Sequence, residues 1–141
     1  MKKSLVTTGI LVAALIIVAG CTKSGSGGST GTVIKSVAVD RLTATLSSST
    51  GQLKKGDQEV TLEFTDASGK PVDVGAVLLS FHMPQMGNMS AMTDSVTFTT
   101  TKTPGVYRGK VNIEVGGEWQ AQLAYEGPAG KGKTTFSVTA Q

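Results

Sequence analysis

Short runs of alternating apolar and polar residues constrain the fold of this chain more than any other feature. In the run 60–65, Val60, Leu62 and Phe64 alternate with threonine and glutamate. Because successive side chains of a strand point to opposite faces of a sheet, this two-residue period predicts a half-buried strand. Similar runs, rich in β-branched residues and separated by turn residues, extend the prediction to seven strands at residues 33–46, 60–65, 76–82, 95–101, 106–115, 118–125 and 133–139.

These runs predict an all-β fold. Seven short strands at close spacing, with no helical pattern among them, are typical of an immunoglobulin-like antiparallel β-sandwich. We expect one such domain over residues 35–141, because roughly a hundred residues suffice for a core of this kind. The large aromatic residues are predicted to fill that core: Phe64, Phe98, Tyr107, Trp119, Tyr125 and Phe136.

The N-terminal segment has the pattern of an export signal. Lys2 and Lys3 precede an apolar stretch that ends in small residues before the only cysteine, Cys21. That stretch is shorter than the 18 or so apolar residues expected of a membrane-spanning helix. The sequence VAGC at positions 18–21 resembles the bacterial lipobox, where a signal peptidase cuts before a cysteine that becomes lipidated. We therefore expect a signal peptide at residues 1–20.

The segment that follows is rich in glycine and serine and predicts a flexible tether over residues 21–34. Lipidation of Cys21 would hold the protein to a membrane of the cell envelope, outside the cytoplasm. The residue after the cysteine is Thr22. An aspartate at this position would oppose sorting to the outer membrane, and threonine does not. In a cell with two membranes, we expect the protein at the periplasmic face of the outer membrane.

Charge and residue types exclude several classes of function. The whole chain carries a net charge of +3, but removal of Lys2 and Lys3 leaves 11 basic against 10 acidic residues, a net charge of +1. This balance excludes an electrostatic nucleic-acid interface. One histidine and one lipidated cysteine cannot supply a usual zinc site. We do not predict an enzyme, because His82 has only nearby serines and Asp94 as potential partners, without a catalytic motif.

Residues 81–92, FHMPQMGNMSAM, contain the only histidine and every methionine except Met1. Thioether sulfur is a soft, uncharged ligand that suits Cu(I) better than Mg²⁺ or Ca²⁺. Pro84 and Gly87 oppose a helix, so the segment is predicted to form a loop. The candidate metal ligands in this loop are the four methionines, with His82 as an optional further ligand: Met83, Met86, Met89 and Met92.

Two considerations leave another interpretation open. Methionine also fills irregular gaps in protein cores and is common on adaptable binding surfaces. In a strand through residues 76–82, Phe81 and Met83 would point inward and His82 outward. One of His82 and Met83 would then not be a ligand, unless a bend at Pro84 brought His82 to the loop, and Met83 could simply cap the core.

A series of short motifs runs along residues 56–138. It begins at a glycine before the VTLEF strand and continues through DASGKPV at 66–72, MPQM at 83–86, GVY at 105–107 and GEW at 117–119. In this order the motifs resemble those of the YtkA-like domain family, which is related to the FixH-like proteins of bacterial envelopes. The resemblance implies an immunoglobulin-like sandwich outside the cytoplasm, with a role in copper handling or respiratory-oxidase assembly.

The resemblance also implies Met83 and Met86 as metal ligands. Family members often have a histidine shortly after this motif, where this chain has Asn88. The difference favours a Cu(I) site dominated by thioethers, in which Met89 and Met92 replace the contribution of the missing histidine.

The sequence thus predicts a membrane-anchored lipoprotein that binds Cu(I) through three of its four thioethers, for copper transfer, storage or protection. Its expected partners are the membrane and a copper-transfer or respiratory-oxidase assembly protein. The alternative is a non-enzymatic interaction module, whose methionine segment contacts a protein of an envelope, efflux or oxidase-assembly complex.

Overall fold

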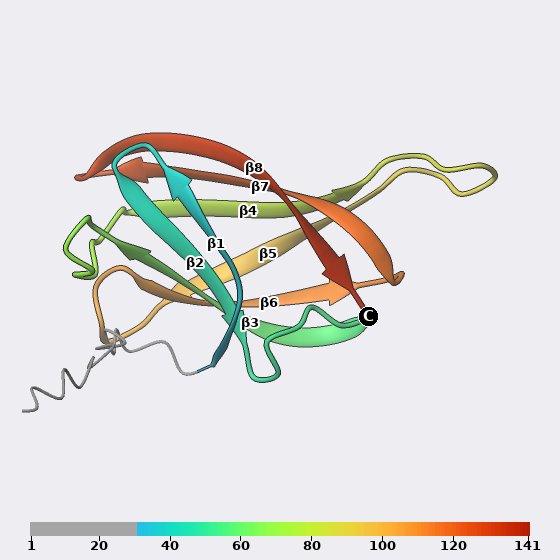
Figure 1. Ribbon diagram of the computed structural model, residues 1–141, viewed down its shortest axis with the longest axis horizontal. Coiled ribbons are helices and arrows are strands. Elements are labelled where there is room, and N and C mark those ends of the chain that lie inside the picture. The colour runs from blue at the N-terminus through green and yellow to red at the C-terminus, as the bar shows by residue number, and fades with distance from the viewer. Residues whose placement is uncertain (1–30) are drawn as a thin grey trace, which may run out of the picture.

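A computed structural model describes residues 31–141. The predicted signal peptide and Cys21 lie outside the described residues. The described chain forms eight antiparallel strands without a helix, and the first strand begins inside the range predicted for the tether (Figure 1). The strands are β1 (Thr32–Val39), β2 (Leu42–Ser48), β3 (Gly56–Thr65), β4 (Ala76–Met83), β5 (Met92–Thr100), β6 (Val106–Ile113), β7 (Gly117–Gly127) and β8 (Gly130–Ala140).

The all-β, antiparallel prediction is confirmed, but the predicted count of seven strands is wrong. The segment 33–46, expected to be one strand, is the hairpin of β1 and β2, in which Val39 lies opposite Leu42. Its turn is Asp40-Arg41, and Asp40 has a positive φ of 54°. Aspartate tolerates this left-handed conformation better than most residues. The turn was missed because it contains neither glycine nor proline, the strongest sequence signals of a turn.

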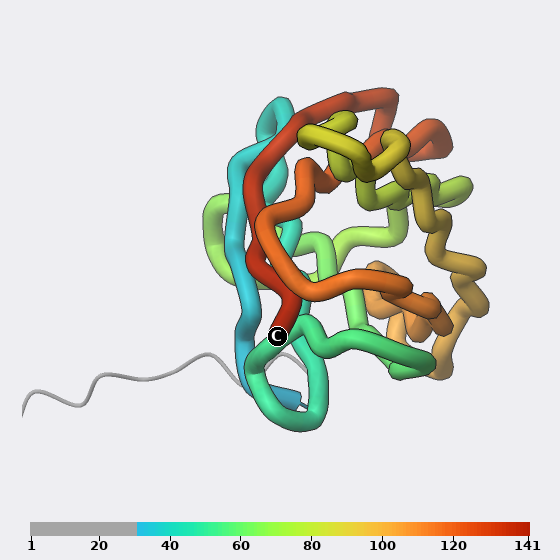
Figure 2. Tube along the Cα trace, turned by 90° about the vertical axis from the view of Figure 1, so that its right-hand side faces the viewer, coloured from blue at the N-terminus to red at the C-terminus, as the bar shows by residue number. Residues whose placement is uncertain are grey.

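The strands follow the order β1-β2-β3-β6-β5-β4-β7-β8. Strand β5 joins the two halves of this order, because its first five residues pair with β4 and its last four pair with β6. The terminal strands β1 and β8 lie side by side in both views (Figures 1 and 2). The sheet therefore curls into a nearly closed barrel, and the predicted immunoglobulin-like sandwich is not confirmed.

The core fills the inside of this barrel and contains most of the predicted aromatic residues. Trp119 and Phe64 are fully buried. The Trp119 indole Nε1 donates a hydrogen bond of 3.0 Å to the Val115 carbonyl oxygen. Phe64 makes edge contacts with Tyr107 and Tyr125, at ring-centroid distances of 6.0 and 5.4 Å. Among the six predicted core aromatics, only Phe98 is half-buried rather than buried.

Tyr107 holds the connection between β3 and β4 against the barrel through hydrogen bonds of its hydroxyl. The Tyr107 hydroxyl donates a 2.9 Å hydrogen bond to Asp73 Oδ1 and accepts a 3.2 Å hydrogen bond from the Val74 backbone N–H. The Gly75 N–H and, secondly, the Tyr107 hydroxyl lower the pKa of the Asp73 carboxyl. Burial raises the pKa of Tyr107 above its ordinary value. Both shifts favour an ionised Asp73 beside a protonated Tyr107.

Replacing Tyr107 by phenylalanine should lower the free energy of unfolding by about 1–3 kcal/mol, because the buried Val74 N–H loses its acceptor. The pKa of Asp73 should rise in the variant, yet stay below the ordinary value because the Gly75 N–H remains. A lowered folded-state pKa stabilises the fold above the unfolded pKa, and this contribution disappears as pH falls through the folded pKa. The part of the unfolding free energy that is lost on acidification should therefore be smaller in the variant than in the original protein. Urea unfolding at several pH values and NMR titration of the carboxyl measure both effects.

Tyr125→Phe is the matched control. The Tyr125 hydroxyl is buried without a hydrogen-bond partner among residues 31–141. Removing it should leave the stability unchanged or slightly raised. Equal losses in the two variants would show that the Tyr107 hydrogen bonds do not stabilise the fold.

Candidate functional site

The candidate metal ligands lie on one β-hairpin formed by β4, β5 and the residues between them. In the segment predicted as a loop, residues 84–91 connect β4 to β5, and the ends of the segment belong to these two strands. Strand β4 continues to Met83, which lies opposite Met92 at the start of β5. Nearer the tip, Met86 and Met89 form a second pair. Their backbones exchange hydrogen bonds of 3.3 Å, from the Met86 N–H, and 2.9 Å, from the Met89 N–H.

A two-residue turn, Gly87-Asn88, sets this pairing. Gly87 has a positive φ of 56°, and Asn88 does not. A glycine at the first turn position is typical of tight hairpins, whose backbone twist matches that of the two strands. The turn lies at the centre of the methionine series, so the regular spacing of three residues produces two facing pairs. Gly-Asn between two strand runs is a hairpin signal, so the sequence itself marks the position of this turn.

The two pairs have different surroundings. Met86 and Met89 are 56% and 41% exposed. Met83 is 3% exposed and belongs to the core, and Met92 is half-buried against the core. A Cβ atom added to Gly117 would lie 3.2 Å from the Met83 methyl carbon, which shows how closely this side chain packs against β7. Met83 therefore caps the core, the second interpretation that the sequence left open.

His82 lies on the outer face of the sheet and is half-buried. Its Nδ1 is 3.1 Å from the Thr93 hydroxyl oxygen, and it lies opposite Thr93 in the pairing of β4 with β5. Met86 follows His82 by four residues, which corresponds to about 13 Å along an extended strand. The structure thus separates His82 from the exposed methionine pair.

This geometry can be compared with known proteins. The sequence model of the YtkA-like family matches residues 36–124, more than half of the chain. The chain belongs to the YtkA-like family. The match includes the methionine hairpin and confirms the resemblance inferred from the sequence motifs. No curated protein matches the sequence.

Among solved structures, the YtkA-like chain is similar to the ZirS C-terminal domain. The two share 11% sequence identity with a TM-score of 0.45, and the similarity covers 100% of this chain and 86% of the other. At this level the similarity supports no argument about function.

Carboxylates do not join the methionines at the hairpin tip of the YtkA-like domain. Asp94 lies opposite Phe81, which places it on the inner face of the sheet, whereas His82 lies on the outer face. Within residues 31–141, no three side chains of His, Cys, Asp or Glu gather closely enough to hold a metal ion. The same described residues contain no apolar helix of membrane-spanning length. Met86 and Met89 are the soft donors that the tip exposes.

The outer part of the hairpin, around its tip, has no acidic or basic residue. Residues 74–93 contain no Asp, Glu, Lys or Arg. In Figure 1, the segment between β4 and β5 extends beyond the rest of the YtkA-like barrel. The tip therefore offers two exposed thioethers, Met86 and Met89, on an uncharged projection.

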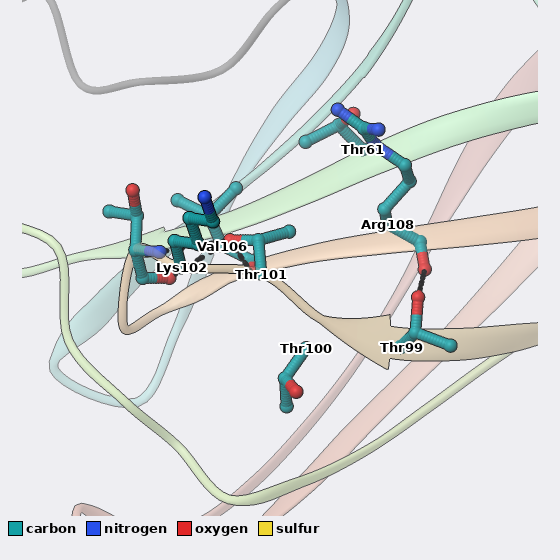
Figure 3. A pocket seen from close by; sticks show the side chains of 8 residues that line it. Thr61, Thr99, Thr100, Thr101, Lys102, Val106 and Arg108 are labelled. Carbon is teal, nitrogen blue, oxygen red and sulfur yellow. Dashed lines mark hydrogen bonds between the residues drawn. The ribbon is translucent and has the colours of Figure 1, made fainter.

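A polar cavity of about 600 Å³ lies elsewhere on the YtkA-like domain (Figure 3). Thr99 donates a hydrogen bond of 3.2 Å to the Arg108 carbonyl oxygen, and Thr101 one of 2.8 Å to that of Val106. The guanidinium of Arg108 pairs with Glu59 at 3.2 Å. Thr99, Thr101 and Arg108 therefore each have a partner within the chain. The lining residues are Thr61, Thr99, Thr100, Thr101, Lys102, Thr103, Val106 and Arg108.

Proposed function

We propose that this YtkA-like domain binds Cu(I) at the hairpin tip through the thioethers of Met86 and Met89. The protein would act as an extracytoplasmic lipoprotein, anchored through Cys21, in copper transfer, storage or protection. The observation that supports the proposal is the pairing of two exposed methionines across a tight hairpin. Opposite side chains of such a pair have Cβ atoms about 4.5–5.5 Å apart, and methionine is flexible enough for both sulfurs to reach one ion.

The exposed position of the two methionines suits the transfer of an ion to or from a partner protein. A partner could approach Met86 and Met89 without opening the core, because both lie outside it. Soft thioethers favour Cu(I) over harder cations. They also need no deprotonation to bind a metal, unlike cysteine or a protonated histidine. Affinity should therefore change little between about pH 5 and 8.

Titration of the full-length protein in detergent with Cu(I), under anaerobic conditions and against a chelator, tests the proposal. Methionine-methyl NMR should show shifts for Met86 and Met89, with little change for buried Met83. The double variant Met86→Leu, Met89→Leu should bind Cu(I) at least tenfold more weakly while keeping its fold, since leucine has a similar volume. Met92→Leu is the matched control and should retain binding. Unchanged binding in the double variant would refute the proposed site.

A second candidate function is a non-enzymatic interaction module of an envelope, efflux or oxidase-assembly complex. The uncharged projection with two exposed methionines favours it, because methionine surfaces adapt to different partners. This function predicts that a crosslinker placed at Asn88 captures the same partner with or without copper. Capture only in the presence of Cu(I) would favour the metal site.

A further inference from the structure

The hairpin tip supplies an incomplete set of donors for the ion proposed above. Met86 and Met89 are the two exposed thioethers of the described chain, while Met83 is buried and Met92 is half-buried. His82 is held beside Thr93, farther down the strand. Two neutral thioethers bind Cu(I) only weakly, and the ion takes further soft donors when they are within reach. A site built on Met86 and Met89 alone therefore leaves coordination positions open.

We propose that a second copy of this chain completes the site, so that one Cu(I) is held between two hairpin tips by Met86 and Met89 of each copy. This inference rests on the proposed function. Each tip would present the same pair of sulfurs, as a two-fold symmetric interface requires. The step is ligand addition without electron or proton transfer: two thioethers of the second chain bind an ion already held by two of the first.

The charge and shape of the tip favour this partner. Residues 74–93 carry no charged side chain, so two tips can approach without repulsion between like charges and without desolvating an ion pair. The tip extends beyond the barrel (Figure 1), which allows the tips to meet while the two barrels remain apart.

The same shape predicts that the dimer depends on the metal. A stable protein interface usually buries more than about 1,000 Å², and contact limited to two narrow hairpin tips would be far smaller. The metal–sulfur bonds would then supply most of the stabilisation. Without metal, the chains should remain monomeric at micromolar concentration.

Sedimentation and native mass spectrometry of the full chain in detergent test the bridge. Ag(I), in chloride-free buffer, serves as a redox-stable soft ion beside Cu(I). We expect monomers without metal, dimers containing one ion for two chains when half an equivalent is added, and a return to monomers with a chelator. Met86→Leu, Met89→Leu should stay monomeric, and Met92→Leu should dimerise like the original chain.

The possible results separate the two proposals. One ion bound to each monomer, without a dimer, would overturn the bridge and leave the proposed copper site standing. No binding of either ion would overturn both. A dimer that forms without metal, or that persists in the double variant, would also overturn the bridge, because its contacts would not be the metal–sulfur bonds.

Discussion

Replacing Trp119 by alanine should lower the free energy of unfolding by about 3–5 kcal/mol. The indole is 0% exposed and is among the largest fully buried side chains of the barrel. Its removal leaves a cavity that a sheet fixed by ladders on both sides of β7 cannot readily close. The Val115 carbonyl oxygen also loses its 3.0 Å hydrogen bond from Nε1. Urea unfolding followed by circular dichroism measures the loss.

Gln120 provides the control for this prediction, since it follows Trp119 on the same strand and is exposed on the opposite face. Gln120→Ala should change the stability by no more than about 0.5 kcal/mol. Trp119→Phe should lie between the two variants, because it keeps much of the apolar volume. A loss below about 1 kcal/mol for Trp119→Ala would show that the indole does not fill the core.

The strands were predictable because their signal is local. Val60, Leu62 and Phe64 alternate with polar residues, and β3 contains all of them with the apolar side chains buried. The prediction that this strand is only half-buried is wrong, because Thr61 and Glu63 on its other face are buried as well. The side-chain directions of Phe81, His82 and Met83 followed from the same period. These features depend only on neighbouring residues of one strand, so the sequence pattern was sufficient.

The barrel closure and the pairing of the methionines depend on contacts between distant segments. Strand β5 exchanges partners between Val96 and Thr97, and no local pattern marks that point. The strand period predicted the inward direction of Met83, but spacing alone did not tell which of Met86, Met89 and Met92 would be exposed. The turn at Gly87-Asn88 fixes the register and separates the exposed pair from the pair at the barrel.

The glycine of the GVY motif should be nearly as sensitive as the tryptophan. Gly105 has a positive φ of 82°, and a Cβ atom there would lie 2.5 Å from the Val72 carbonyl oxygen and 2.7 Å from its nitrogen. Neither segment can move easily. The Phe64 N–H donates a 2.9 Å hydrogen bond to the Gly105 carbonyl oxygen. The Val72 N–H donates a 2.8 Å hydrogen bond to the Phe64 carbonyl oxygen. Gly105→Ala should therefore lower the free energy of unfolding by about 2–5 kcal/mol, from backbone strain and overpacking together.

Gly69→Ala separates these two causes, because Gly69 has the same φ of 82° and an added Cβ would meet no atom within 4 Å. Gly69→Ala should lower the free energy of unfolding by the backbone strain alone, about 1–2 kcal/mol. The difference between the two variants in urea unfolding then measures the overpacking against Val72, expected at about 1–3 kcal/mol. Equal losses would mean that the 66–72 segment shifts to accept the methyl group. In that case Gly105 would be required for its backbone conformation and not for its close contact with Val72.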